Sequence, residues 1–428
     1  MPGRERYDVV ICGASIAGCT AARLFALAGA RVALVEQRSD PAAYKVACTH
    51  QIQSSAVPTI ERLGLAPSLE QAGAVRSRAA GWSPYGGWLR FPADAPAGYG
   101  VTRRTLDPMV RGLAAETPGV EYFPGQAVVG LLAGRDRVAG VEAESPDRTR
   151  RPFPATLVVA ADGRDSTVAR LARAPARVRP HNRFVYFAYW RGVRSPKGEA
   201  RVWLLDPDGA AVFPNEDDVT VVAAVPHKGR LPEFRADPEG AYRRMVDDLP
   251  DGPDLASAER VSKLIGKLEM PNKMRGAVRG GIAFIGDAAL ATDPLFGVGC
   301  GWAFQSAEWL VDETRSALLD HGDIDAALRR YRNVFRRRLG LHHMQIVDYS
   351  TGRAMRLNER VMFRAAAADP VVAAAVEEVA ARRRSPLRLF DPRLSTRLLA
   401  HQIRATGARA RYCANNVAGE RGDRSRRP

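Results

Sequence analysis

The segment from residue 7 to residue 36 restricts the fold more than any other part of the chain. Residues 7–12, Tyr-Asp-Val-Val-Ile-Cys, form a short apolar run that ends at a glycine, which predicts a buried parallel strand. Residues 17–28 carry helix-forming side chains, and Gly29 is suited to end that helix. Residues 31–36 predict the next strand. Together these segments predict a βαβ unit of about thirty residues, the start of an α/β fold.

The turn inside this unit, Gly13-Ala14-Ser15-Ile16-Ala17-Gly18, resembles a dinucleotide-binding loop in its spacing. Gly13 permits the tight turn, Gly18 lets helix and strand pack closely, and Ser15 stands where many such loops have a second glycine. Because Glu36 ends the second strand, its carboxylate can pair with ribose hydroxyls. The alternative is a glycine-rich turn in an α/β domain without a ligand. The residues predicted to line the dinucleotide site are Gly13, Ser15, Ile16, Ala17, Gly18 and Glu36.

A second glycine-rich segment lies far along the chain, where apolar residues 281–285 lead into Gly286-Asp287. A turn that contains Pro294 then opens onto an amphipathic stretch from about residue 298 to residue 318. This order brings a carboxylate close to a helix N-terminus. The carboxylate can accept hydrogen bonds from the hydroxyl groups of a polyol, and the helix start offers free N–H groups to an electron-rich oxygen.

The composition excludes several classes of protein. With 428 residues, 46% of them hydrophobic, the chain can build two closely packed domains. No run of eighteen or more uninterrupted apolar residues is present, so we expect no membrane span. The five cysteines show no CxxC spacing, which argues against a disulfide scaffold or a metal site and favours the cytoplasm.

The formal net charge is +16, and arginines are frequent in the C-terminal part of the chain. A basic chain of this kind requires that nucleic-acid binding be considered. No aromatic residues interleave the arginine runs, as a stacking surface for bases would require, so we expect no nucleic-acid partner. The acidic surface of a carrier or partner protein remains an alternative.

The remaining patterns divide the chain into regions. A helix is predicted over residues 106–116, with Asp107 and Pro108 in its first turn. An inserted antiparallel sheet is predicted by alternating patterns at residues 184–190, 201–205, 210–213 and 219–225. The predicted regions are a dinucleotide-binding domain over 1–180 with small sheet insertions near 76–100, the antiparallel-sheet substrate domain over 181–275, a return to the first domain over 276–330, a helical region over 331–413 and a disordered tail over 414–428.

A third motif is the segment Ala160-Ala161-Asp162-Gly163-Arg164-Asp165-Ser166-Thr167-Val168-Ala169-Arg170. With the three motifs in this order, the chain resembles the para-hydroxybenzoate-hydroxylase-like flavoprotein superfamily from about residue 7 to about residue 330. That superfamily contains FAD-dependent monooxygenases, flavin-dependent halogenases and geranylgeranyl reductases. The resemblance implies FAD as the cofactor and a Rossmann-like FAD-binding domain.

The resemblance also implies roles for individual residues at the nucleotide end. The glycine-rich loop would line the FAD pyrophosphate, with Glu36 on the adenosine ribose and the backbone of Val128 beside the adenine. Arg103 matches the arginine that reaches the flavin phosphate or the ribityl chain, and Arg104 is the alternative if the register shifts. Asp162 is similar to an aspartate near the cofactor and the path of the pyridine nucleotide; alternatively, it caps the next helix.

At the flavin end, the resemblance places Asp287 on the ribityl chain. After Pro294, the backbone N–H groups of Gly297, Val298 and Gly299 would face the pyrimidine edge of the isoalloxazine. A positive helix end there stabilises the reduced, anionic flavin. The reduced flavin reacts with oxygen to give a flavin hydroperoxide, which implies hydroxylation or epoxidation of a substrate bound nearby.

Two segments bear on the choice among the activities of this superfamily. Gly209 and Ala211 replace both tryptophans of the Trp-x-Trp-x-Ile-Pro segment of tryptophan-type halogenases, which leaves space next to the flavin for a substrate. The segment from Lys45 to His50 only partly matches the Lys-x-Cys-Gly or Gly-Glu patterns of reductases and halogenases. Lys45 is a candidate halogenase-like amine. His50 is a candidate to deprotonate a phenol or orient the substrate; alternatively, it is a loop histidine bonded to backbone.

The sequence therefore predicts an FAD-dependent monooxygenase that acts on an aromatic or polyketide-like small molecule of secondary metabolism. NAD(P)H or a partner flavin reductase would supply the electrons, because no second glycine fingerprint for a nicotinamide nucleotide is present. The alternatives are a flavin-dependent halogenase, a geranylgeranyl-reductase-like enzyme, and a nucleotide-binding module that docks on RNA or an acidic partner.

Overall fold

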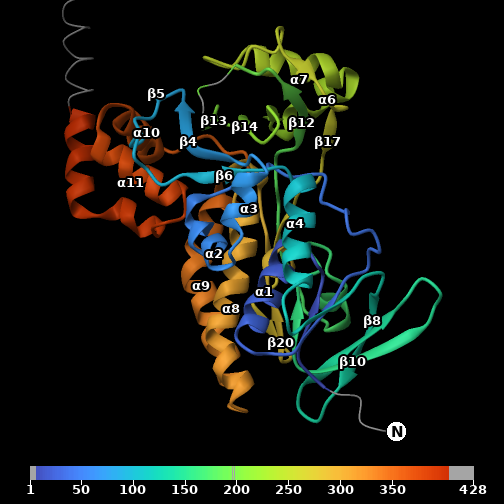
Figure 1. Cartoon of the computed structure of the whole chain (residues 1–428). Helices are drawn as coiled ribbons and strands as arrows, with labels where there is room; N and C mark the ends of the chain where they lie inside the picture. The colour runs from blue at the N-terminus through green and yellow to red at the C-terminus, as the bar shows by residue number, and fades with distance from the viewer. Residues whose placement is uncertain (1–5, 195, 197, 404–428) are drawn as a thin grey trace, which may run out of the picture.

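The computed structural model describes residues 6–194, 196 and 198–403. The chain forms a mixed α/β fold with a Rossmann-like domain, further sheets and a helical C-terminal region, as the sequence predicts. Figure 1 shows the mainly parallel sheet, with β10 and β20, in the lower half of the molecule and the second large sheet, with β4, β12, β13 and β14, in the upper half.

The first sheet has eight strands, and its central order is β19-β20-β10-β1-β2-β7. The pairs from β20 through β10, β1 and β2 to β7 are parallel. Parallel strands have nearly continuous apolar sequences because both faces of the sheet are covered. The bounds are β1 (Tyr7–Cys12), β2 (Val32–Val35), β7 (Val120–Phe123), β10 (Arg150–Ala160), β19 (Val278–Arg279) and β20 (Ile282–Phe284).

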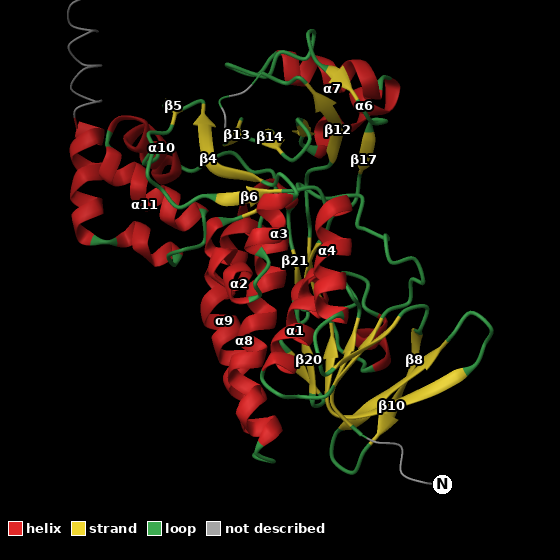
Figure 2. Ribbon diagram, in the orientation of Figure 1, coloured by secondary structure: helices red, strands yellow, loops and turns green. Residues whose placement is uncertain are grey.

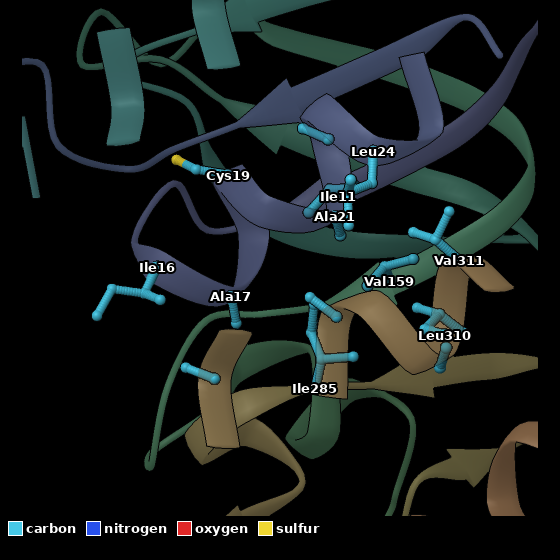
Figure 3. Close-up of a cluster of buried hydrophobic side chains, with 14 of the residues drawn as sticks. Ile11, Ile16, Ala17, Cys19, Ala21, Leu24, Val159, Ile285, Leu310 and Val311 are labelled. Carbon is cyan, nitrogen blue, oxygen red and sulfur yellow. The ribbon is translucent and has the colours of Figure 1, made fainter. Parts of the chain in front are cut away.

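Helices α1 (Ile16–Leu27) and α8 (Gly299–Leu319) pack against each other and against this sheet, and α9 (Ile324–Tyr349) packs against α8. The predicted βαβ unit is thereby confirmed. Figure 3 shows that side chains from β1, β10, α1 and α8 meet in one buried cluster, with labels on Ile11, Ala21, Leu24, Val159, Leu310 and Val311. This packing holds the starts of α1 and α8 at the same edge of the sheet.

Beyond the parallel pairs, β8 (Ala127–Ala133) and β9 (Val138–Glu144) extend the sheet as an antiparallel hairpin. β9 pairs with the first half of β10, whose second half pairs with β1. The hairpin protrudes from the lower part of the molecule (Figure 2). The sequence predicts strands over residues 120–123, 127–132 and 138–144, and the structure has β7, β8 and β9 there.

Helix α4 (Arg103–Ala115) begins three residues earlier than predicted, so the expected start at residue 106 is wrong. Pro108 therefore lies inside the helix, and Asp107 lies in its second turn. The reason is a contact that periodicity does not reveal: the ring of His50 accepts a hydrogen bond from the N–H of Arg103 at 2.8 Å. A satisfied N–H group at this position allows the helix to start there.

The second large sheet has ten strands in the order β16-β12-β15-β14-β13-β4-β6-β3, with β17 on β12 and β5 on β4. The predicted antiparallel strands are confirmed as β12 (Val185–Arg191), β13 (Glu199–Leu204), β14 (Gly209–Pro214) and β15 (Val219–Val225). β4, from the earlier part of the chain, joins them parallel to β13. The other bounds are β3 (Gln51–Ile52), β4 (Val75–Ser83), β5 (Gly87–Trp88), β6 (Gly98–Gly100), β16 (Glu259–Arg260) and β17 (Ile265–Lys267).

Smaller elements connect these layers. A three-stranded sheet, β11-β18-β21, follows the strand order β11 (Arg177–Arg179), β18 (Asn272–Met274) and β21 (Leu290–Ala291). Helices α6 (Leu231–Ala236) and α7 (Pro238–Asp247) lie near β12 at the top of Figure 1. The remaining short helices are α2 (Val57–Arg62), α3 (Ala66–Gln71) and α5 (Thr167–Leu171).

The C-terminal part is helical as predicted, with α10 (Leu357–Ala368), α11 (Pro370–Ala380) and a further helical stretch over 392–403. These helices form a separate group beside the second sheet (Figure 1). The predicted tail over 414–428 lies outside the described residues. None of the helices in the described part of the chain combines the length and the apolarity that a membrane crossing requires.

Candidate active site

A cavity of about 610 Å³ opens at the carboxyl ends of the parallel strands. Its wall includes Cys12 at the end of β1, Val35 at the end of β2, and Ala161 directly after β10. The far side is formed by strands of the second sheet. A cleft at this edge of an open parallel sheet is where such folds bind ligands, and its volume is within the range of ligand pockets.

The start of α1 forms one part of the wall through Gly13, Ser15, Ile16 and Ala17. Gly13 has φ +107°, and a Cβ there would lie 2.6 Å from the carbonyl oxygen of Ala161, so the turn requires glycine. No side chain caps the first turn of α1, and no acidic residue lies in it. The N–H groups of this turn and the positive helix end are therefore available to an anion such as a pyrophosphate.

Glu36 reaches the same cavity and also fixes the loop. One carboxylate oxygen accepts a hydrogen bond from the N–H of Ala14 at 2.8 Å, and the other accepts from the N–H of Arg38 at 2.9 Å. Val128 on β8 lines the same end of the cavity. The structure thus brings together the acidic residue and the strand position that the sequence assigns to the nucleotide end.

A second helix start, that of α8, faces the cavity from a segment distant in the chain. Pro294, Gly297, Val298 and Gly299 all line it. Gly297 has φ +60°, the α8 N-cap Val298 makes no side-chain cap, and the first turn holds no acidic residue. A Cβ on Gly299 would meet nothing within 4 Å, so open space borders this turn. The first turn of α8 therefore suits the electron-rich edge of a flavin ring.

Asp287 lies on the wall between the two helix starts, where its carboxylate binds Lys45. The Nζ atom of Lys45 is 2.8 Å from Oδ2 of Asp287. Burial raises the pKa of Asp287, but the Lys45 ammonium opposes burial and brings the pKa below its ordinary value. An ionised carboxylate at this position can accept hydrogen bonds from ligand hydroxyls. Both Asp287 and Lys45 therefore line the part of the cavity that lies between the two helix starts.

Arg103 is the centre of a buried polar network at the cavity wall. Its guanidinium donates to the Ser15 hydroxyl at 2.8 Å and to the carboxylate of Asp107 at 2.7 Å. Arg104, the alternative register, is exposed. The structure therefore selects Arg103 as the arginine that reaches the glycine-rich loop.

Asp162 combines the two interpretations offered by the sequence. Its Oδ2 accepts a hydrogen bond from the N–H of Val168 at 3.0 Å, near the start of α5. Its Oδ1 is buried and has no hydrogen-bond partner among the described residues. Burial raises the pKa of this carboxyl. Asp162 lines the cavity, so one oxygen caps the helix while the other is available to a ligand donor.

Two of the predicted residues do not line the cavity. Gly18 packs against the backbone of the loop instead, and a Cβ there would lie 1.8 Å from the carbonyl oxygen of Gly13. His50 is 1% exposed, and its Nε2 is 2.7 Å from the hydroxyl of Tyr189, while its Nδ1 accepts from Arg103. Burial lowers the pKa of His50, which favours the neutral ring. With both ring nitrogens engaged, His50 corresponds to the alternative of a loop histidine bonded to backbone.

The apolar wall of the cavity comes from the second sheet. One face of this sheet lines the cavity, and the other packs in a separate hydrophobic cluster. Odd-numbered residues face the cavity, namely Val185, Phe187, Ala211, Phe213, Val221, Ala223 and Val225. Even-numbered neighbours such as Phe184 and Val222 pack in a separate cluster with Phe234 of α6 and Tyr242 of α7. Trp190 and Trp203 belong to that second cluster and are therefore core residues.

The space predicted from Gly209 and Ala211 is present at only one of the two positions. Ala211 lines the cavity. Gly209 does not, because a Cβ there would lie 2.9 Å from a methyl carbon of Leu295. The side chain of Leu295 thus occupies the volume beside Gly209, and the expectation of space at both positions is wrong for Gly209.

Sequence reasoning missed a pair of cysteines on the cavity wall. Cys48 and Cys300 both line the cavity, and their sulfur atoms are 3.7 Å apart. They are 252 positions apart in the chain, so spacing motifs gave no signal. Cys12 and Cys19 are buried and pack in the hydrophobic core as small apolar side chains.

Comparison with known proteins identifies the domain that surrounds the cavity. A family described as "FAD binding domain" matches residues 6–332. A digeranylgeranylglycerophospholipid reductase of Methanopyrus kandleri is 26% identical over 338 residues, which cover 76% of this chain and 85% of the relative. A kynurenine 3-monooxygenase of Salinispora arenicola is 27% identical over 385 residues, which cover 84% of this chain and 82% of the relative.

Solved structures show the same fold. A flavoprotein/dehydrogenase from Cytophaga hutchinsonii superposes with a TM-score of 0.76 at 17% identity, and the match covers 94% of this chain and 100% of that protein. Structural neighbours also include FAD-dependent monooxygenases, halogenases and geranylgeranyl-reductase-like proteins. The shared architecture is therefore compatible with several chemistries.

Proposed function

We propose, from the premise that this chain belongs to the FAD-binding domain family, that it is an FAD-dependent monooxygenase for an aromatic or polyketide-like small molecule. The coarser statement, an FAD-dependent oxidoreductase, follows from the family. One observation carries the finer proposal: two uncapped helix starts and a continuous apolar wall border the same cavity. The helix starts suit a dinucleotide that carries a flavin, and the apolar wall suits a carbon-rich substrate.

Different residues of the cavity would hold different parts of FAD. The first turn of α1 and Ser15 would hold the pyrophosphate, and Glu36 would hold the ribose of the adenosine. Asp287 would accept hydrogen bonds from the ribityl hydroxyls. The first turn of α8 would direct N–H groups and a positive helix end toward the ring.

When bound, the flavin supplies two-electron redox chemistry and the activation of oxygen. The protein supplies the environment for that chemistry. Apolar side chains of β12, β14 and β15 exclude water from the cavity and position a substrate by contact and shape. Ala211 provides room on that wall, whereas the bulkier Phe213 two residues later restricts it.

The first experiment identifies the cofactor and the electron source. Purified protein should be yellow, and the released flavin should chromatograph as FAD. Anaerobic mixing with NADH or NADPH should then bleach the flavin, and failure with both would assign the electron supply to a partner flavin reductase. Colourless protein that stays colourless after addition of FAD would refute the proposal.

The second experiment distinguishes monooxygenase activity from halogenase activity. In the presence of phenolic and polyketide-like compounds, the enzyme should consume oxygen and yield a product that has gained one oxygen atom. Ala211→Trp should keep its FAD content but raise KM at least about tenfold, because the indole would fill the apolar part of the cavity, whereas Ala211→Val should have a smaller effect. Brominated product with bromide would instead indicate a halogenase.

A double-bond reductase is the second candidate. It is favoured by the relatives that are named digeranylgeranylglycerophospholipid reductases and by Lys45 and Cys48 in the loop before β3. In that case, anaerobic reduced enzyme should transfer its electrons to an isoprenoid double bond, and the reaction should proceed without oxygen. Dependence of product formation on oxygen would exclude this candidate.

A further inference from the structure

Cys48 and Cys300 form a close pair of thiols on the cavity wall. Their sulfur atoms are 3.7 Å apart, whereas a disulfide bond is about 2.05 Å long. Cys300 lies in the first turn of the long helix α8, and Cys48 lies in the irregular connection between β2 and β3. Because one partner belongs to a loop, a movement of less than about 2 Å in total is enough to bring the sulfurs to bonding distance.

The surroundings of the pair favour a reactive thiolate. The guanidinium of Arg103 is 3.9 Å from the sulfur of Cys48, and the backbone N–H of His50 donates to that sulfur at 3.3 Å. The hydrogen bond with Cys300 lowers the pKa of Cys48 well below its ordinary value, and the nearby cations act in the same direction. The same hydrogen bond raises the pKa of Cys300. Of the two sulfurs, Cys48 is therefore the one whose surroundings favour the thiolate.

We propose that Cys48 and Cys300 form a redox-active site that reacts with hydrogen peroxide and closes to a disulfide. The Cys48 thiolate attacks one peroxide oxygen, the O–O bond breaks, and hydroxide leaves, so that Cys48 becomes a sulfenic acid. The Cys300 sulfur then attacks the Cys48 sulfur, and the sulfenic oxygen leaves as water. In sum, two thiols and one peroxide give one disulfide and two waters.

The position of the pair gives this reaction a consequence. The disulfide would join the connection between β2 and β3 to the first turn of α8, so oxidation would tie together two walls of the cavity. Lys45, which binds Asp287, belongs to the same connection. The proposal does not depend on which substrate the enzyme oxidises, because the oxidant is peroxide and both sulfurs belong to the chain.

Peptide mapping tests the proposal directly. Full-length protein carrying Cys413→Ser, which removes the cysteine outside the described residues, is reduced, freed of reductant and treated with one equivalent of hydrogen peroxide. Free thiols are then blocked with N-ethylmaleimide, and the protein is digested without reduction. We expect mass spectrometry to find a Cys48–Cys300 linked peptide, while the buried Cys12 and Cys19 remain thiols.

A matched variant separates a reacting pair from a single reactive cysteine. In Cys300→Ser, a dimedone adduct should accumulate on Cys48, because no second thiol can resolve the sulfenic acid. Recovery of Cys48 and Cys300 as free thiols in the parent protein, at a peroxide dose that oxidises glutathione, would overturn the proposal. Sulfinic acid on Cys48 with Cys300 free in the parent would also overturn it. Flavin content is measured separately, so failure to bind FAD is distinguishable from failure of the thiol reaction.

Discussion

Gly18→Ala tests how the start of α1 is built. A methyl group at residue 18 would lie 1.8 Å from the carbonyl oxygen of Gly13, whereas real Cβ contacts essentially never fall under 3.0 Å. The two groups would have to separate by at least the difference, 3.0 − 1.8 = 1.2 Å. The loop has little room to retreat, because Gly13 itself packs closely against the backbone of Ala161.

Two opposing contributions set the expected magnitude. Alanine favours a helix interior over glycine by about 1 kcal/mol. Overpacking against fixed backbone costs about 1–3 kcal/mol, and sometimes more. Because the clash is with backbone atoms and α1 also packs against α8, we expect the upper part of that range. The net result is destabilisation by roughly 1–2 kcal/mol, and the displaced loop should also weaken FAD binding at least about tenfold.

Gly112→Ala is the matched control for this substitution. Gly112 lies inside α4, and a Cβ there would meet nothing within 4 Å. It should therefore stabilise the protein by about 0.5–1 kcal/mol. Urea and thermal unfolding of flavin-free protein measure both effects, and fluorescence titration measures FAD affinity. If Gly18→Ala unfolds like the parent and keeps its FAD affinity, the packing of α1 on the Gly13 loop has been misinterpreted.

Two further predictions concern buried charges and ring protonation. Arg103→Ala leaves the 2%-exposed carboxylate of Asp107 without its cation, so the free energy of unfolding should fall by about 3–5 kcal/mol, whereas the exposed Arg104→Ala should change it by less than about 0.5 kcal/mol in urea titrations. Burial lowers the pKa of His343 to about 4 in the folded protein. The contribution of the neutral ring to the free energy of unfolding is therefore fully present above about pH 6.5, and it is lost as the pH decreases toward 4. Between pH 7 and pH 5 the parent should lose about 2 kcal/mol more than His343→Leu; equal losses would contradict a buried neutral ring.

The parallel half of the fold could be predicted because local signals agree there. Strand β1 has the predicted bounds, and α1 differs from the prediction by one residue at each end. Apolar runs, a glycine turn and a terminal glycine all specify the same βαβ unit, so no contact from elsewhere is needed. The start of α4 could not be predicted in the same way, because His50, far earlier in the chain, accepts its first N–H group.

The same difference between local signals and distant contacts applies to the residues of the candidate site. Positions tied to backbone conformation, such as Gly13 and Gly297, reach the cavity as expected, since each requires a positive φ at a turn that the sequence already indicates. Positions identified by residue type alone depend on contacts that only the tertiary fold provides. The residue type of His50 suits acid–base chemistry, but its ring is used for structural hydrogen bonds. The Cys48–Cys300 pair has no local pattern and emerges only from the tertiary fold.

The second sheet explains why the substrate wall could not be assigned from sequence. An antiparallel strand with one face in water alternates between apolar and polar residues, so its buried face can be recognised. β15 is apolar on both faces, because Val222 and Ala224 pack toward α6 and α7 while Val221 and Ala223 line the cavity. The cavity face of this sheet is therefore as apolar as its core face, and it borders the cavity while it also packs against Leu295, Tyr349 and Met355. An apolar sheet face that lines the cavity beside two uncapped helix starts is the feature that favours a carbon-rich substrate next to a flavin.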